Sequence, residues 1–137
     1  MNILLLLTPK RDVAFINDDF TLRQALEKME FHRYSAIPIL NRQGNYIGTL
    51  TEGDVLWFLK NNTQLNLKKA EEMPVNSIPR IRDNFPVKID TDLDDLVAKS
   101  INQNFIPVLD DQNLFIGIIT RKDVLLFCHK QMLKHPF

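Results

Sequence analysis

Hydrophobic and polar positions along the chain follow one pattern twice. In each half, apolar residues at helical spacing come before two short apolar runs, and helical spacing returns after them. Polar residues and Gly separate the two runs of each pair, as expected for turns between paired strands. The pattern therefore predicts two units that share the order strand, helix, strand, strand, helix.

The expected elements can be placed by residue number. The paired strands are residues 37–40 and 46–50 in the first half and 106–109 and 114–119 in the second. The helix before each pair follows a capping-type residue, Thr21 or Asp92. Its apolar stripe is Leu22, Ala25, Leu26 and Met29 in the first half, and Leu93, Leu96, Val97 and Ile101 in the second. Each half has a further helix after its paired strands, and it carries Val55 in the first half and Val124 in the second. We interpret Trp57, on the first of these helices, as a core residue.

The sequence indicates the first strand of the first half more clearly than that of the second. Residues 13–16 read as a strand in the first half, whereas residues 78–81 or 87–89 could serve in the second. The apolar run 3–7 is too short to cross ~30 Å of hydrocarbon, which takes about 20 residues. We expect it to form a short helix that ends at Thr8 and Pro9.

The two halves are copies of one sequence. Residues 35–56 align with residues 104–125 at a constant offset of 69 without a gap, and ten positions are identical. Chance pairing at average residue usage gives roughly one or two identities in such a window. The identities include a Gly-x-x-Thr-x-x-Asp signature, formed by Gly48, Thr51 and Asp54 and by Gly117, Thr120 and Asp123.

Charge and cysteine usage exclude some classes of function. Lys and Arg number 17 and Asp and Glu also 17, so the chain has no basic field that would attract nucleic acid or an acidic membrane. The single cysteine, Cys128, lies in an apolar run, which indicates a buried thiol in a reducing compartment. We therefore expect a cytoplasmic protein that contacts neither nucleic acid nor membrane.

The repeated order of elements, with the signature after the last strand of each copy, resembles the CBS domain pair known as a Bateman module. The resemblance covers nearly the whole chain, and an Ile-Pro pair in each copy, at Pro38 and Pro107, also matches the family. It implies an α/β fold of tandem βαββα repeats packed by pseudo-twofold symmetry. Residues 1–64 would form the first repeat with its N-terminal helix. Residues 65–137 would form the second, with a lead-in helix at 67–73.

The resemblance also implies two nucleotide sites, each combining base contacts from one copy with the Thr and Asp of the other. The first site would comprise Val13, Ala14, Tyr34, Ser35, Ala36, Ile37, Thr120, Arg121, Lys122 and Asp123. The second, weaker site would comprise Thr51, Asp54, Asn104, Phe105 and Ile106.

The signature suits an adenine nucleotide for stated chemical reasons. An ionised carboxylate can accept a hydrogen bond from each of two adjacent ribose hydroxyls. The N-terminus of a helix favours a phosphate. Arg121 and Lys122 add positive charge at the second signature, whereas Glu52 adds negative charge at the first, so we expect phosphorylated ligands to prefer the second. The alternative is that Thr-x-x-Asp only forms a capping box.

These observations predict a regulatory sensor that binds AMP, ADP, ATP or cyclic di-AMP and signals to a partner protein. Residues 77–81 and 120–122 look similar to small cyclic di-AMP binders of this family, whereas Asp123 is typical of mononucleotide binders, so the ligand stays open. We expect a homodimer, no enzymatic activity and no cofactor besides the nucleotide as regulatory ligand. His32, His129 and His135 show no ligand spacing, so we expect no metal site. The alternative function is a structural dimerisation module with empty pockets.

Overall fold

The computed structural model describes residues 2–62, 64 and 66–135. The chain forms two compact units. The first unit, Ala14–Asp83, contains the first sequence copy. The second unit joins the N-terminal segment that ends at Val13 to the chain from Asn84 onward.

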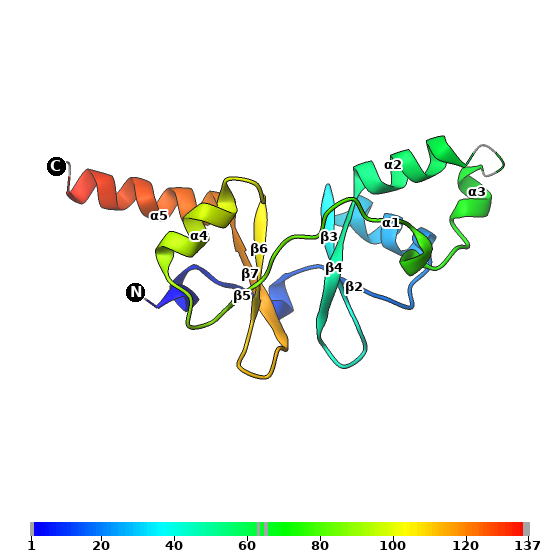
Figure 1. The fold of residues 1–137 in the computed structure, drawn as a ribbon. Helices are drawn as coiled ribbons and strands as arrows, with labels where there is room; N and C mark the ends of the chain where they lie inside the picture. The colour runs from blue at the N-terminus through cyan, green and yellow to red at the C-terminus, as the bar shows by residue number, and fades with distance from the viewer. Residues whose placement is uncertain (1, 63, 65, 136–137) are drawn as a thin grey trace. The chain divides into compact units, whose positions relative to one another are not determined.

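The first unit is a three-stranded sheet with helices. Its strands run in the order β2, β3, β4, with β2 parallel to β3 and β3 antiparallel to β4 (Figure 1). The strands are β2 (Ile16–Asn17), β3 (Ala36–Leu40) and β4 (Tyr46–Thr51). The helices are α1 (Leu22–His32), α2 (Glu52–Asn61), α3 (Leu67–Ala70) and the 3-10 turn η3 (Val75–Ser77).

The core of the first unit collects apolar side chains from every one of these helices and strands. α1 begins at Thr21, whose side chain and that of Gln24 form a capping box, and its buried face carries Leu22, Ala25 and Met29 as the spacing predicts. The buried cluster comprises Ala14, Ile16, Leu22, Ala25, Met29, Ile37, Ile39, Leu50, Val55, Ala70, Val75 and Ile78.

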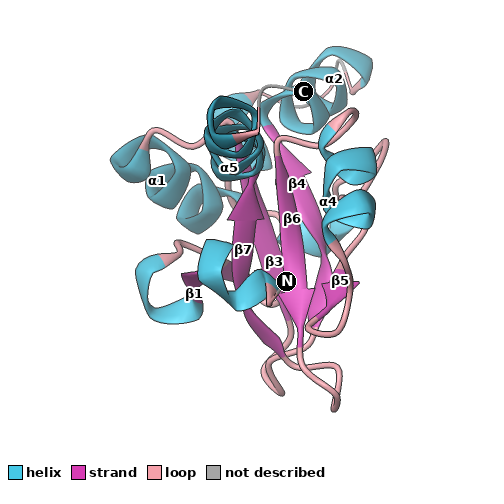
Figure 2. Ribbon diagram, turned by 90° about the vertical axis from the view of Figure 1, so that its left-hand side faces the viewer, coloured by secondary structure: helices cyan, strands magenta, loops and turns pink. Residues whose placement is uncertain are grey.

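The second unit has a four-stranded sheet in the order β1, β7, β6, β5 (Figure 2). β1 is antiparallel to β7, β7 is antiparallel to β6, and β6 is parallel to β5. The strands are β1 (Thr8–Pro9), β5 (Val87–Lys88), β6 (Phe105–Leu109) and β7 (Phe115–Thr120). The helices are η1 (Ile3–Leu6), η2 (Lys10–Asp12), α4 (Leu93–Ser100) and α5 (Arg121–Lys134).

The core of the second unit mirrors the first in residue type. Its buried cluster comprises Ile3, Val87, Leu96, Ile106, Val108, Ile119 and Val124. Ile3 of the short N-terminal helix belongs to this cluster, so the helix expected at residues 3–7 is present and packs on the second sequence copy. Cys128 is half-buried and packs against the same cluster.

The structure confirms the α/β class and the tandem repeat, and it decides the open strand. The first strand of the second copy is β5, Val87–Lys88, which pairs with β6, whereas Ile78 is buried in the core of the first unit. The strand expected at residues 13–16 is shorter than predicted, since only Ile16–Asn17 pair with β3. The expected boundary between copies at residues 64 and 65 touches Leu65, which lies outside the described residues, and stays a prediction.

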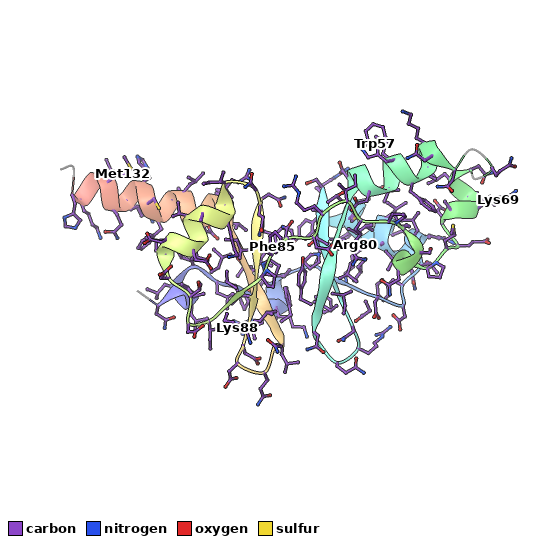
Figure 3. All side chains as sticks on the ribbon, in the orientation of Figure 1. Trp57, Lys69, Arg80, Phe85, Lys88 and Met132 are labelled. Atoms are coloured by element: carbon purple, nitrogen blue, oxygen red, sulfur yellow. The ribbon has the colours of Figure 1, made fainter. Side chains whose placement is uncertain are left out.

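The interpretation of Trp57 as a core residue is wrong. Its side chain is 46% exposed. α2 buries Val55 and packs Phe58 and Leu59 against the first core, and this stripe places Trp57 on the outer face of the helix (Figure 3). Across the described part of the chain, no helix combines the length and the apolar character that crossing a bilayer requires.

Candidate nucleotide site

The first Thr-x-x-Asp motif closes the start of α2. Thr51 has an extended backbone, with φ −112° and ψ 158°, and is the N-cap. Its Oγ1 accepts a hydrogen bond from the N–H of Asp54 at 3.0 Å. Its own N–H donates to Oδ2 of Asp54 at 3.0 Å. Thr51 and Asp54 therefore form a capping box in the first copy.

The second carboxylate oxygen of Asp54 is also engaged. Oδ1 accepts a hydrogen bond from the backbone N–H of Ile81 at 3.1 Å. Asp54 is only 3% exposed, and a buried carboxylate requires such partners because desolvation of an unpaired charge is costly. Both oxygens of Asp54 thus accept hydrogen bonds from the backbone of the same unit.

Residues 80–83, which we call the linker strap, lie against β4. Oδ1 of Asp83 accepts from the backbone N–H of Thr49 at 2.9 Å and from Nε of Arg80 at 2.8 Å. Nη2 of Arg80 lies 3.4 Å from Oδ2 of Asp83. The Arg80 side chain is mostly buried, so this pair is better shielded than the exposed ion pairs of the unit. The strap is therefore fixed at Thr49 and at Asp54.

Gly48 of the signature lets the side chains of Arg80 and Asp83 approach the backbone of β4 closely. A Cβ added there would lie 2.5 Å from Oδ1 of Asp83 and 2.7 Å from Nε of Arg80. Gly117 occupies the corresponding position in the second unit, where an added Cβ would clash with the backbone oxygen of Thr8. In the first copy a side chain approaches the strand, and in the second a backbone strand does so.

The second Thr-x-x-Asp motif is built differently. Thr120 is the N-cap of α5, and its Oγ1 accepts from the N–H of Asp123 at 3.1 Å. The return bond of a capping box is absent between these two residues. Within the described residues the half-buried Asp123 carboxylate has no hydrogen-bond or ion-pair partner. Asp123 therefore offers a carboxylate at the N-terminus of a 14-residue helix.

The two cations predicted beside this motif have different surroundings. Nε of Arg121 donates to the backbone oxygen of Ser100 at 2.7 Å and to that of Gln103 at 3.1 Å. This contact satisfies carbonyl groups at the carboxyl end of α4, so Arg121 has a structural role. Lys122 is exposed. The structure thus leaves Lys122 as the freer of the two cations.

Most of the predicted base contacts of the first copy meet at the start of β3. The N–H of Ala14 points to the Tyr34 hydroxyl at 3.5 Å, and the oxygen of Ser35 accepts from the N–H of Glu52 at 3.0 Å. Ser35 is exposed and Ala36 is half-buried. Ile37 is fully buried in the core and pairs with Leu50 of β4. Val13 belongs to the second unit.

The matching contacts of the second copy lie at the start of β6. The oxygen of Asn104 accepts from the N–H of Arg121 at 2.9 Å, as Ser35 does at the matching place. The oxygen of Phe105 already accepts from Nδ2 of Asn84 at 2.9 Å and from Nε2 of Gln103 at 3.2 Å. Ile106 is fully buried. The Phe105 carbonyl is therefore engaged by protein groups.

Sequence reasoning missed Gln103. Its Oε1 accepts from the N–H of Phe85 at 2.9 Å, and its Nε2 donates to the oxygen of Phe85 at 3.1 Å. Gln103 stands 69 residues after Tyr34, so the repeat offset itself marks the position that contacts the segment before the first strand. For Arg80 and Asp83, the repeat offset gave no comparable indication of their contacts. In the part of the chain that the structure describes, no cluster of His, Cys, Asp and Glu could hold a metal ion.

A comparison with known proteins places this repeat in a family. The family model of the CBS domain matches residues 6–61 and residues 75–130, one match for each sequence copy. The chain belongs to the CBS domain family. The resemblance inferred from the two Thr-x-x-Asp signatures is thereby confirmed.

Relatives of this CBS pair differ in length. A CBS domain-containing protein of Dictyostelium discoideum is 30% identical over 135 residues, which cover 91% of this chain and 90% of the relative. An inosine-5'-monophosphate dehydrogenase of Methanocaldococcus jannaschii is 26% identical over 115 residues, which cover 84% of this chain and 21% of the dehydrogenase. The chain thus spans about a fifth of that enzyme's length.

Solved structures with this CBS fold include ligand complexes. CbpB in complex with c-di-AMP aligns with a TM-score of 0.83 at 23% identity, covering 98% of this chain and 88% of CbpB. CBSX2 in complex with AMP aligns with a TM-score of 0.76 at 20% identity, covering 94% of this chain and 96% of CBSX2. These likenesses establish the shared fold.

Proposed function

We propose that this CBS pair is a regulatory module that binds an adenine nucleotide through the Thr120 and Asp123 motif. The ribose hydroxyls donate to the Asp123 carboxylate, and a phosphate lies near the N-terminus of α5 and Lys122. Charge-assisted hydrogen bonds of this kind contribute about 1.5–3 kcal/mol each.

One observation carries the proposal, namely the carboxylate of Asp123. It is half-buried at the start of a long helix, and no group of the described chain donates to it. A carboxylate in that position costs desolvation without a compensating bond, and two hydroxyl donors would provide one. The positive end of the helix dipole favours a nearby anionic ligand.

Adenine nucleotides bound to structural neighbours support the choice of ligand class. CbpB was solved with c-di-AMP and CBSX2 with AMP, and both share this fold. AMP, ADP, ATP and cyclic di-AMP are therefore the ligands to test on this chain. The mechanism we propose is regulatory: the nucleotide stabilises one arrangement of the module, and a partner protein responds to it.

The remaining parts of the proposal concern assembly and setting. We propose a homodimer formed through exposed apolar helix faces, a cytoplasmic location consistent with one unpaired cysteine, and no catalytic activity of the module itself. The proposal gives the module no cofactor other than the regulatory nucleotide.

Thermal melting with and without nucleotide tests the proposal. A ligand at 100 times its dissociation constant adds about 2.7 kcal/mol to the free energy of unfolding, which raises Tm by several degrees in a chain of this size. We expect such a shift with at least one of AMP, ADP, ATP and cyclic di-AMP. We expect none with GMP as the control. Unchanged melting with all four adenine ligands would contradict the proposal.

A second function, a structural dimerisation module with empty pockets, is favoured by the first motif alone. Asp54 acts as a helix cap and has no free oxygen. If both motifs were caps, Asp123→Asn would lower stability and no nucleotide would shift Tm. If the proposed function holds, Asp123→Asn removes the nucleotide shift and costs the free protein no more than the helix-dipole contribution of a first-turn acid, about 0.3–1 kcal/mol.

A further inference from the structure

The two copies carry the same Thr-x-x-Asp motif in two different states, and in the first copy the linker strap contacts the motif. In the first unit, residues 80–83 contact both the last strand and the motif aspartate. We infer that the strap withholds Asp54 from ligands, so that the nucleotide-free chain keeps its first motif closed. The inference concerns the regulation of the proposed function and rests on it for the identity of the excluded ligand.

The backbone holds both oxygens of the Asp54 carboxylate. Oδ2 accepts from the N–H of Thr51 and Oδ1 from the N–H of Ile81. The Ile81 N–H, 27 residues away in sequence, brings the strap against the carboxylate. Asp54 is almost fully buried, so a ligand cannot approach it until the strap moves.

The strap has a built-in second anchor. Thr49 is fully buried on β4, and its N–H donates to Oδ1 of Asp83. Arg80 holds the same oxygen from within the strap. The side chain of Asp83 therefore takes the place that a backbone carbonyl of a further strand would have.

The strap is held by polar contacts rather than by packing. Ile78, just before it, is buried in the first core, whereas the Ile81 side chain is 76% exposed and Arg82 is exposed. A segment anchored at one end and joined elsewhere by a few hydrogen bonds can open without disturbing the core. The strap is thus a reversible cover on the first motif.

The second unit shows the contrast. The edge of β7 is covered by the backbone of β1, whose register pairs Thr8 with Ile118 and Pro9 with Gly117. No residue of that covering strand donates to the carboxylate of Asp123. β1 thus covers the edge of β7 without contacting Asp123. The strap covers β4 and donates a hydrogen bond to Asp54.

Carboxyl labelling of the nucleotide-free full chain tests the strap directly. The probe is a carbodiimide with glycine ethyl ester, and mass spectrometry follows each aspartate. We expect Asp54 to label at least tenfold more slowly than Asp123 in the wild type. Ile81→Pro removes the N–H that holds Asp54 and should raise the labelling of Asp54 severalfold. Ile81→Ala keeps the N–H and removes only an exposed side chain, so it should not change that rate.

A second pair of variants guards against a folding defect. Asp83→Ala removes the anchor at Thr49 and should also raise the labelling of Asp54. Asp19→Ala, the matched control, removes a carboxylate that pairs with Arg42 on the surface of the same unit and should leave the rate unchanged. Equal labelling of Asp54 and Asp123 in the wild type would overturn the inference. An Asp54 rate that neither Ile81→Pro nor Asp83→Ala raises, in proteins with wild-type circular dichroism, would do the same.

Calorimetric titration with AMP separates this inference from the proposed function. We expect one equivalent per chain in the wild type and two in Ile81→Pro. Two equal sites in the wild type would overturn the inference while leaving the proposed function standing. AMP binding to no variant would overturn the proposed function for AMP, whereas the labelling rates would still decide whether the strap covers Asp54.

Discussion

The backbone N–H of Ile81 donates to the carboxylate of Asp54 across 3.1 Å and so joins the linker between the copies to the helix start of the first copy. The corresponding carboxylate in the second copy, that of Asp123, has no partner among the described residues. One signature thus serves two purposes in one chain. At Asp54 both carboxylate oxygens accept backbone hydrogen bonds, and at Asp123 the described chain supplies no donor to the carboxylate.

The glycines of the first motif should respond in opposite directions to alanine. Gly48→Ala would place a Cβ 2.5 Å from Asp83 and 2.7 Å from Arg80, so we expect a loss of about 1–3 kcal/mol in the free energy of unfolding. Gly53→Ala meets nothing closer than 3.7 Å within α2, and we expect a gain of about 0.5–1 kcal/mol. Urea denaturation measures both. Equal stability of the two variants would show that the strap does not press on Gly48.

The contact between Asp95 and Lys99 on α4 should make stability depend on pH. Lys99 Nζ at 2.7 Å, and then the Thr91 hydroxyl at 2.8 Å, lower the pKa of Asp95 below its ordinary value of 3.8. Because the folded pKa is depressed, the stabilisation is present above 3.8 and is lost as pH falls through the lowered value. We expect Asp95→Asn to cost about 0.3–0.5 kcal/mol at pH 7, since the pair is partly exposed.

Urea denaturation at pH 7 and at pH 2.5 checks this expectation. The difference between wild type and Asp95→Asn should shrink at the lower pH. Asp94→Asn, which changes an exposed acid of the same helical turn, controls for the helix dipole. A difference between wild type and Asp95→Asn that stays constant with pH would show that the carboxylate charge is not involved.

Arg121 and Lys122 should separate stability from phosphate binding. Arg121→Ala removes two hydrogen bonds to backbone carbonyls and should cost about 1–3 kcal/mol in the free energy of unfolding. Lys122→Ala alters an exposed cation and should change stability by less than about 0.5 kcal/mol.

Lys122→Ala should instead lower affinity for ATP more than for adenosine. Two unit charges about 4 Å apart at an effective dielectric of about 20 interact by roughly 4 kcal/mol. A quarter of that energy, about 1 kcal/mol, corresponds to about a fivefold change in affinity. Calorimetry with both ligands measures this difference, with Lys130→Ala, an exposed lysine further along α5, as the control. Parallel losses for ATP and adenosine would exclude a phosphate contact at Lys122.

The exposed apolar face of α5 should support self-association. Leu125, Leu126, Met132 and Leu133 are exposed, and a groove of about 440 Å³ is lined by Arg121, Lys122, Leu125, Leu126 and His129. Apolar patches of this kind favour protein contacts. We expect sedimentation at tens of micromolar to give twice the chain mass of 16.0 kDa. We expect Leu126→Asp to give 16.0 kDa, and a wild-type monomer would contradict the homodimer.

Local rules explain what the sequence could predict of the fold. Thr21 and Asp92 cap helices as expected because a cap depends on residues three positions away. The hairpins follow from polar turns between apolar runs. Trp57 was misplaced because several apolar residues follow one another on α2, and only the packed structure shows which of them face the core.

The strap could not be predicted because its contacts are distant in sequence. Asp83 meets Thr49 34 residues earlier, and no repeat spacing marks the pair. The sequence could not decide between residues 78–81 and 87–89 as the first strand of the second copy, because that choice also depends on tertiary contacts. Ile78 is buried in the core of the first unit, whereas Val87 pairs with β6 in the second. The chemistry of the two aspartates also differs only through such tertiary contacts, although their local sequences match.

AMP titration of Asp123→Asn beside Asp54→Asn tests the central claim most directly. Asp123→Asn should lose about tenfold or more in affinity, because two charge-assisted hydrogen bonds to ribose weaken, and should lose no more than about 0.3–1 kcal/mol of stability. Asp54→Asn should keep the wild-type affinity and lose about 1–3 kcal/mol of stability, because the amide cannot accept from both backbone donors. AMP affinity that falls in Asp54→Asn and holds in Asp123→Asn would contradict the account.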